Sequence, residues 1–308
     1  LGVPVDTFVD PYRLVGEAQF NFRTKDVEPG IVAGFQERAG RWVATYRELA
    51  NRLGEAPGPL GLKLQLTPQS SFEEAMAAGE ALGKQWELGD VPAERLEPAI
   101  DRHLRTLVLY VDAPEGVSGA AAHLPRYDTI LINRRESAAR RYFDLAHELF
   151  HILTWDAMPP ATVEGWEVRK SKGNRVEYLA DNFAGALLMP SEVVTKRWGE
   201  RGSGDVAAWL ARTASELRVS GDALRWRLTN LKLLPAARAE SLVVRPLRRG
   251  REREPRLFSR RFVGLVSRAV NEGRLSLRRA AGLLELSVAD LGELCTAYGH
   301  PLTYDLAG

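Results

Sequence analysis

The segment DLAHELFHIL (144–153) combines residue types and a spacing that suit hydrolysis at a metal ion. His147 and His151 are four residues apart, so on a helix their rings lie on one face and can reach one zinc ion. Glu148 follows the first His and is placed to act as general base toward water at that ion. The alternative is a pair of core histidines that bond to the backbone. The His–Glu–His pattern therefore predicts a zinc site with its own base.

The residues around this motif predict the elements that hold it. TILIN (129–133) is apolar and rich in β-branched residues, which favours a buried strand. The next residues form a turn, and Ser137 can cap a helix that runs through SAARRYFDLAHELFHILTW. We therefore expect a strand, a turn and a helix that presents the motif.

Zinc needs a third protein ligand, and the best candidates lie in VEYLADNFAGALLMP (176–190). The apolar repeat in this segment predicts a helix that ends at Pro190. Glu177 and Asp181 are four residues apart, so one carboxylate can bind the metal while the other orients a ligand histidine. By spacing alone, Glu177 fits an exposed helix carboxylate nearly as well. Weaker candidates lie in the segment that connects the two helices: Asp156, Glu164 and Glu167.

In combination, AHELFH and the pattern ExxxDxFAxxLLMP about 26 residues later resemble the ImmA/IrrE family of zinc metallopeptidases. The resemblance covers about residues 90–235. It implies a small zincin-like peptidase domain with a short sheet and an HExxH helix. It also implies His147 and His151 as zinc ligands, Glu148 as catalytic base and Glu177 as third ligand.

Two further residues are interpreted beside this resemblance. We expect Asp181 to be the carboxylate that orients a ligand histidine through a hydrogen bond. Phe150 departs from the family pattern, because many members have Gly at this place. A Phe changes the packing beside the metal but removes no ligand, so the predicted chemistry is kept.

Substrate contacts are predicted on VSGAAAHL (117–124), a run of small side chains with one His. A small-residue edge strand beside the metal helix can hold a peptide by strand addition, and the resemblance implies that a substrate backbone lies there. We therefore predict substrate binding by Gly119, Ala120 and His123. The candidates for the donor that stabilises the oxyanion are Tyr178, His123 and Tyr127.

Length and composition limit the class of protein. At 308 residues the chain is long enough for two or three domains, and its 45% hydrophobic and 27% charged content is ordinary for a soluble protein. No apolar run approaches the roughly 18 to 20 residues that span a membrane, and no signal peptide is visible. Cys295 is the only cysteine, which excludes a disulfide framework and a cysteine-based zinc site and suggests a buried thiol. These features predict a cytoplasmic protein.

The N-terminal flank carries two patterns. LGVPVDTFVDPYRL (1–14) resembles the exit of a Cro/repressor-type helix-turn-helix domain, which would then precede Leu1; a plain arm is the alternative. A long helix is predicted over residues 29–53, from Pro29 to the Gly that follows Leu53. An apolar residue recurs in it every seventh position, which favours core packing over a dimer seam: Phe35, Trp42 and Leu49.

The C-terminal flank suggests contact with nucleic acid. Residues 205–234 have helix-turn-helix spacing, with Arg225 and Arg227 available for phosphate contact if the second helix meets DNA. Residues 238–279 hold 13 Arg and no Lys against four Glu and no Asp, a local net charge of +9. The final residues, from 259 on, predict three short helices. Structural support and a solvated linker are the alternatives.

We therefore predict an α+β fold, in which a zincin-like metallopeptidase domain has mainly helical flanks. The predicted function is zinc-dependent cleavage of a protein, most readily a helix-turn-helix repressor, so that gene expression is controlled. The alternatives are a DNA-binding regulator with the zincin-like domain as sensor or scaffold, and an antitoxin-like partner protein. A homodimer is also predicted as a possibility. The predicted parts are residues 1–60 (arm and long helix), 61–200 (peptidase), 201–237 (helical pair), 238–258 (Arg-rich linker) and 259–308 (small helical domain).

Overall fold

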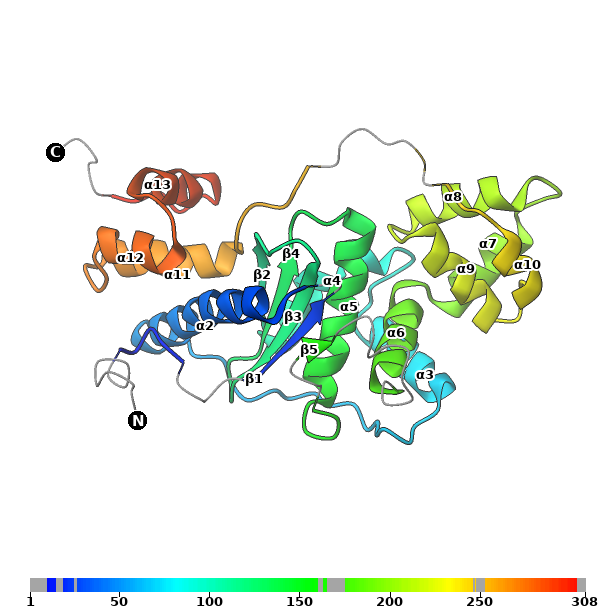
Figure 1. The fold of residues 1–308 in the computed structure, drawn as a ribbon, viewed down its shortest axis with the longest axis horizontal. Helices are drawn as coiled ribbons and strands as arrows, with labels where there is room; N and C mark the ends of the chain where they lie inside the picture. Colours follow the sequence, from blue (N-terminus) through cyan, green and yellow to red (C-terminus); the bar gives the residue numbers. More distant parts are fainter. Residues whose placement is uncertain are drawn as a thin grey trace.

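The computed structural model describes residues 10–14, 19–24, 27–159, 163–164, 175–245, 247 and 253–303 (Figure 1). The strands are β1 (Gln19–Thr24), β2 (Leu107–Val111), β3 (Val117–His123), β4 (Thr129–Asn133) and β5 (Val163–Glu164). The helices are α2 (Pro29–Arg52), α3 (Phe72–Gln85), a 3₁₀ turn η1 (Pro92–Glu94), α4 (Leu96–Leu104), α5 (Ala138–Thr154), α6 (Arg175–Leu188), α7 (Ser191–Gly199), α8 (Val206–Glu216), α9 (Gly221–Asn230), α10 (Ala236–Ser241), α11 (Arg260–Asn271), α12 (Leu277–Leu284) and α13 (Val288–Ala297). Within this described part, no helix is both long and apolar enough to cross a membrane. The predicted α+β class is confirmed.

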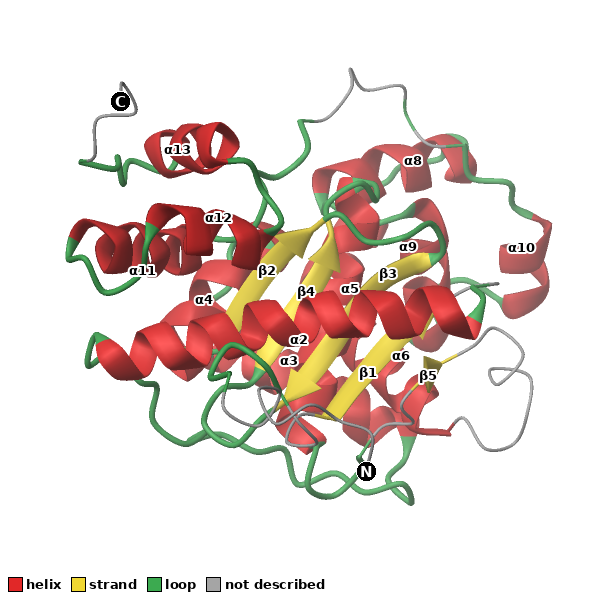
Figure 2. Cartoon of the chain, turned by 60° about the vertical axis from the view of Figure 1, so that its left-hand side comes forward, coloured by secondary structure: helices red, strands yellow, loops and turns green. Residues whose placement is uncertain are grey.

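Five strands form one mixed sheet in the order β2-β4-β3-β1-β5 (Figure 2). Strand β3 runs antiparallel to β4 and to β1, whereas β2 and β4 are parallel. Three apolar runs joined by short turns, residues 104–112, 117–124 and 128–133, predict three antiparallel strands. All three strands are present, but the antiparallel arrangement is wrong for β2 and β4. Strand β4 inserts between β2 and β3, so it lies beside β2, which runs in the same direction.

Strand β1 occupies the edge of β3 at which substrate was expected. Its register pairs Gln19 with His123, Phe22 with Ala120 and Arg23 with Gly119. The prediction that β3 is an edge strand is therefore wrong, since β4 and β1 use the backbone groups on its two sides. Strand addition needs those groups, so the predicted substrate contacts on β3 are not available to a peptide backbone while β1 is in place.

The two faces of the sheet lie against two hydrophobic cores. Along β4, Ile130 and Ile132 belong to the first core and Leu131 to the second, because successive side chains of a strand point to opposite faces. Helices α4 and α5 contact the first face, with α6 and then α3 packed beyond α5 (Figure 1), and α2 and α11 contribute to the core on the second face. The predicted metal helix, α5, is therefore fixed between the sheet and α6.

The apolar stripe of α2 packs inside the chain, as favoured from its sequence. Phe35, Trp42 and Leu49 are buried in the second core, to which α11 and α12 also contribute. Trp42 meets Phe258 edge to face, with ring centroids 5.3 Å apart. The three predicted C-terminal helices are present as α11, α12 and α13, and Cys295 is buried as a free thiol. The C-terminal helices and α2 thus bury their apolar faces together.

Helices α3 and α6 pass very close to each other at Gly79. A Cβ atom there would lie 2.5 Å from the carbonyl oxygen of Phe183 and 3.0 Å from the amide nitrogen of Leu187. We expect Gly79→Ala to lower the free energy of unfolding by about 1–3 kcal/mol, because helix backbone must move apart. Urea denaturation measures this, and Gly34→Ala is the control, since a Cβ at Gly34 meets nothing within 4 Å. Equal effects of the two substitutions would contradict the close crossing.

The predicted helix-turn-helix pair is present as α8 and α9, but its arginines face inward. Arg227 is 3% exposed, donates to the carbonyl of Met189 at 2.9 Å and pairs with Glu80. Arg225 donates to the carbonyls of Ala239 and Leu242. The expectation that Arg227 is available to phosphate is therefore wrong, because its guanidinium joins α9 to α3 and to the end of α6.

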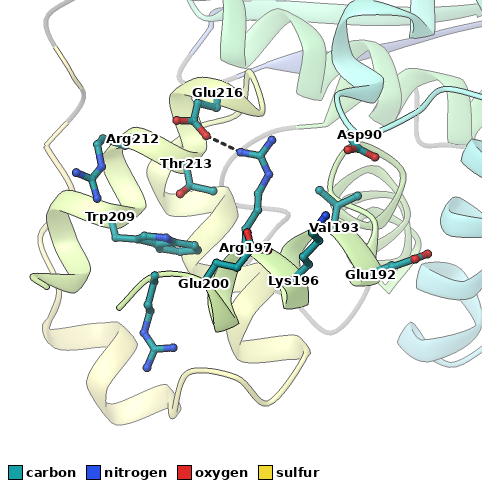
Figure 3. A pocket seen from close by; sticks show the side chains of 11 residues that line it. Asp90, Glu192, Val193, Lys196, Arg197, Glu200, Trp209, Arg212, Thr213 and Glu216 are labelled. Atoms are coloured by element: carbon teal, nitrogen blue, oxygen red, sulfur yellow. Dashed lines mark hydrogen bonds and ion pairs between the residues drawn. The ribbon is translucent and has the colours of Figure 1, made fainter. Parts of the chain in front are cut away.

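The surface between α7 and α8 also lacks the charge pattern of a phosphate-binding face. Figure 3 shows a hollow there in which Arg197 of α7 pairs with Glu216 of α8 at 2.5 Å. Basic and acidic side chains alternate around it: Lys196, Arg197, Arg201 and Arg212 against Asp90, Glu192, Glu200 and Glu216. Their charges balance, which disfavours a polyanion as the ligand of this hollow.

Arg227 should therefore matter for stability. We expect Arg227→Gln to lower the free energy of unfolding by roughly 1–3 kcal/mol, since Glu80 and the Met189 carbonyl lose their buried donor. Thermal or urea denaturation measures the change. Arg212→Gln on exposed α8 surface is the matched control and should change stability by less than about 0.5 kcal/mol. A stable Arg227→Gln protein with weakened DNA binding would instead support the DNA-contact prediction.

Candidate metal centre

One face of α5 carries the residues that could do chemistry. The helix begins after Ser137, whose hydroxyl accepts from the amide of Arg140 at 3.4 Å, as predicted for an N-cap. Asp144, His147, Glu148 and His151 recur at intervals of three and four residues and therefore point to the same side. All four side chains are fully buried. The helix thus places two imidazoles and two carboxylates in the layer between the sheet and α6.

Helix α6 brings Glu177 to the two imidazoles. The Nε2 atoms of His147 and His151 are 3.1 Å apart, and the Oε atoms of Glu177 lie 3.1 Å from the first and 3.4 Å from the second. A tetrahedral ion with bonds of about 2.0–2.1 Å separates its donors by roughly 3.3 Å. The two Nε2 atoms and the two carboxylate oxygens of Glu177 therefore lie at separations close to those that one zinc ion requires, and His147, His151 and Glu177 form the ligand group found among the described residues.

Asp181 lies behind the first imidazole. Its Oδ1 is 2.9 Å from Nδ1 of His147. A carboxylate can only accept, so Nδ1 carries a hydrogen, and Nε2 is the nitrogen whose lone pair is available to a metal ion when the ring is neutral. This is the arrangement by which a carboxylate fixes the tautomer and the ring orientation of a metal-binding histidine.

The protein groups shift three pKa values at this place. Burial lowers the pKa of His147, but the hydrogen bonds to Asp181 and Glu177 outweigh it and raise the pKa to about 9. Burial raises the pKa of Glu148 to about 8, against the attraction of the His147 ring. Burial lowers the pKa of His151. A cation between the donors would favour neutral imidazoles and an ionised Glu177.

Glu148 is buried without a hydrogen-bond partner for either carboxylate oxygen among the described residues. Such a group is costly unless something polar joins it. Strand β3 passes directly beside it, and a Cβ atom at Gly119 would lie 3.5 Å from Oε1 of Glu148. Gly119, predicted as a substrate contact, instead keeps side-chain atoms away from the base. The site therefore has a buried carboxylate in need of a polar partner, beside a strand residue that has no side chain.

Two charged residues at the site were missed by the sequence analysis, Arg23 and Asp144. Arg23 Nη1 donates to Asp144 Oδ1 at 2.9 Å, and Nη2 donates to Asp181 Oδ1 at 3.2 Å. The signal was present in QFNFR (19–23), where polar and apolar residues alternate as in a strand with one apolar face. Phe20 and Phe22 enter the second core, so the polar residues of β1 face α5.

The weaker third-ligand candidates are not part of this group. Asp156 is exposed beyond the end of α5 and pairs with Lys63. The side chain of Glu164, and all of Glu167, lie outside the described residues. Glu177 itself is 4% exposed, so its interpretation as an exposed helix carboxylate is wrong.

The candidate oxyanion donors have other surroundings. Tyr127 packs on Tyr46 in the second core, on the far side of the sheet. Nδ1 of His123 donates to Asp128 at 2.6 Å, and the His123 ring stacks on Trp155 at the end of α5. Tyr178 is about half exposed and contacts Phe72. None of the three is placed with the metal-ligand group by these contacts.

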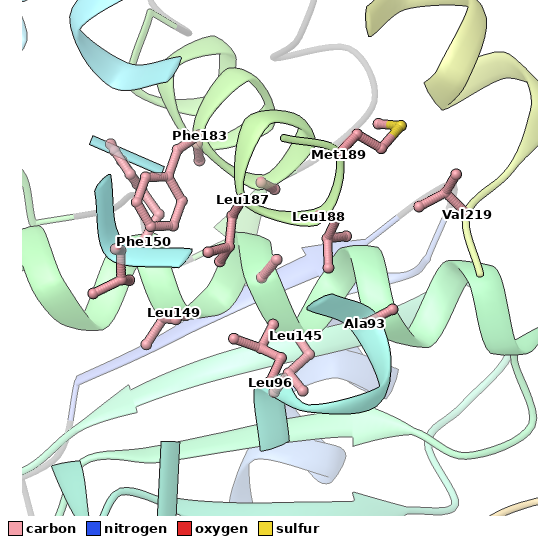
Figure 4. Packing of buried hydrophobic residues seen from close by; sticks show 14 of the residues in the cluster. Ala93, Leu96, Leu145, Leu149, Phe150, Phe183, Leu187, Leu188, Met189 and Val219 are labelled. Carbon is pink, nitrogen blue, oxygen red and sulfur yellow. The ribbon is translucent and has the colours of Figure 1, made fainter. Parts of the chain in front are cut away.

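Phe150, the departure from the family pattern, fills the contact between α5 and α6. Its ring is fully buried, 5.5 Å from the ring of Phe183 and 5.7 Å from that of His151 (Figure 4). It packs α5 against α6, contacts the ring of His151 and takes the place of no metal ligand. The expectation that a Phe alters only the packing here agrees with this geometry.

The comparison with protein families matches residues 105–229 to the IrrE N-terminal-like domain, a peptidase family. The comparison with curated proteins found no match. The matched region runs from β2 to α9 and contains α5 and α6, and with them both halves of the ligand group. The resemblance to the ImmA/IrrE family is thereby confirmed. Residues 105–229 form an IrrE N-terminal-like domain, and the chain thus carries a metallopeptidase-like domain of this family.

Proposed function

We propose that this chain is a zinc-dependent endopeptidase that cleaves a protein substrate. The observation that carries the proposal is a set of three donors at tetrahedral separations beside a buried glutamate without a partner among the described residues. In this proposal His147, His151 and Glu177 hold the ion. Two imidazoles and one carboxylate suit zinc best among the common divalent ions, manganese included.

Zinc at these donors would polarise the scissile carbonyl and lower the pKa of water. Glu148 removes a proton from the attacking water as the water oxygen bonds to the carbonyl carbon. It then donates that proton to the leaving amine as the C–N bond breaks, so that one water is consumed and two peptide ends are released. Its burial supports this exchange, because burial raises the pKa of the carboxyl group and so helps it to hold a proton between the two steps. Asp181 holds His147 in the tautomer that presents Nε2.

We propose a helix-turn-helix transcriptional repressor as the substrate, so that cleavage controls gene expression. This part rests on the resemblance to the ImmA/IrrE family. It is tested by identifying new protein N-termini by mass spectrometry after cell extract is incubated with the zinc-loaded chain, with and without chelator. New N-termini that need zinc, one of them in a helix-turn-helix protein, are expected. If zinc-dependent cleavage occurs only in proteins of other kinds, the proposed substrate is wrong. If no protein is cleaved, the proposed peptidase activity is wrong.

The alternative, a DNA-binding regulator with a zincin-like sensor, has weaker support. Arg225 and Arg227 bond to the interior of the chain, and residues 1–9 and 248–252, parts of the other two motivating segments, lie outside the described residues. DNA contact and a homodimer stay predictions. A mobility-shift assay in which Glu148→Ala binds DNA and regulates as the wild type does would favour this alternative.

A further inference from the structure

We infer that Arg23 is a positioning residue of the metal centre, supplied by a strand that lies outside the matched family domain. It holds Asp181 in place on the imidazole of His147. The inference rests on the proposed metal-dependent function and adds a part to it, because residues 19–24 precede the matched region of residues 105–229.

The contacts form one continuous chain of charge-assisted hydrogen bonds. Nη1 of Arg23 donates to Asp144 at 2.9 Å and Nη2 donates to Oδ1 of Asp181 at 3.2 Å. The same Oδ1 atom accepts from Nδ1 of His147 at 2.9 Å. One guanidinium thus bridges a carboxylate on α5 and a carboxylate on α6, and the second of these touches the ligand imidazole.

Burial makes this bridge unlike a surface ion pair. The side chains of Arg23 and Asp144 are 6% and 0% exposed, whereas that of Asp181 is 32% exposed. Charges that are removed from water must be paired, so Arg23 and Asp144 constrain each other strongly. Asp181 can be reached by solvent, and loss of the hydrogen bond from Arg23 would make it easier for its carboxylate to rotate toward water. Arg23 therefore supplies the fixed partner that keeps Oδ1 on His147.

The sheet fixes where the guanidinium lies. Arg23 is paired with Gly119 in the register of β1 and β3, and Gly119 is the residue that passes beside Glu148. Phe22 is fully buried in the second core and holds the strand from its other face. The positive charge is consequently delivered beside the proposed base, and its attraction lowers the pKa of Glu148 against the larger effect of burial.

Arg140 offers a matched comparison. It also pairs with Asp144, at 3.0 Å, but its side chain is 44% exposed. Arg140 donates to Asp144 and to the hydroxyl of Ser118, whereas Arg23 donates to both Asp144 and Asp181. Substitution of either arginine removes a positive charge beside Asp144. Substitution of Arg23 also removes the hydrogen bond from Arg23 to Asp181.

The test measures zinc affinity by competition with a chromophoric chelator, and the visible spectrum of the cobalt-substituted protein. The full chain is compared with Arg23→Gln, Arg23→Lys, Asp181→Asn, Arg140→Gln and the double variant Arg23→Gln/Asp181→Asn. We expect Arg23→Gln and Asp181→Asn each to weaken zinc binding by about 10- to 100-fold and to change the cobalt spectrum in the same way. The double variant should bind as weakly as Asp181→Asn alone, because both changes break one link. Arg140→Gln should stay within about twofold of the wild type.

Arg23→Lys keeps a positive charge for folding but has a single ammonium instead of a planar fork, so it should fold and still bind zinc more weakly. Wild-type affinity in both Arg23 variants, or effects of Arg23→Gln and Asp181→Asn that multiply, would overturn the positioning role and leave the zinc site standing. A wild-type chain that binds no zinc would overturn both this role and the proposed function.

Discussion

Glu148→Gln is expected to reduce peptide hydrolysis by about 10²- to 10⁴-fold while zinc content and fold are kept. An amide cannot take a proton from water at neutral pH, and general-base catalysis contributes a factor of this size. Glu148 itself is not one of the three donors at tetrahedral separations, so the substitution leaves the ligand group intact. The rate is measured on a substrate identified by its new N-terminus, with zinc per chain determined on the same sample.

The control for this substitution is Glu73→Gln, which removes an exposed carboxylate at the start of α3. It should leave the rate within about twofold. A Glu148→Gln protein that hydrolyses as fast as the wild type would show that another group takes the proton, and the mechanism proposed above would be wrong. A lower hydrolysis rate with unchanged zinc per chain distinguishes loss of the base from loss of the metal.

His151→Ala is expected to weaken zinc binding by on the order of 10²- to 10³-fold. Structural zinc sites with four ligands bind with roughly 10–16 kcal/mol, so one ligand contributes about 3–4 kcal/mol. The ring of His151 is fully buried and its Nε2 lies 3.1 Å from that of His147, so no exposed residue can take its place without rearrangement. Elemental analysis of the purified protein should give about one zinc per wild-type chain and much less in the variant.

Zinc binding should also raise the melting temperature, because an ion that binds only the folded state stabilises that state. We expect chelator to lower the melting temperature of the wild type and to have little effect on His151→Ala. His103→Ala is the control, because His103 is exposed and stacks on Trp86 away from the ligand group. If the wild type takes up no zinc when it is offered, the HExxH pattern is not a working site in this chain, and the DNA-binding alternative becomes the better hypothesis.

The sequence by itself determined the features that depend on neighbours along one helix. The placement of His147 and His151 one turn apart on a helix and the Ser137 cap are both present as predicted. Each of these depends on contacts within about one turn of helix, where the geometry of the backbone is known in advance. The choice of Glu177 over the nearby carboxylates came from the family resemblance, because its spacing suited both a ligand and an exposed side chain.

Only the tertiary structure decided which distant segments complete the site. The alternation in residues 19–24 is compatible with any half-buried strand, and nothing local says that it pairs with β3 and carries Arg23 to Asp181. In the same way Arg227 looks like a surface arginine in the sequence, yet α3 supplies the Glu80 that holds it inside. These strand partners and buried ion pairs join residues that are roughly a hundred positions or more apart, so no short segment of the sequence can predict them.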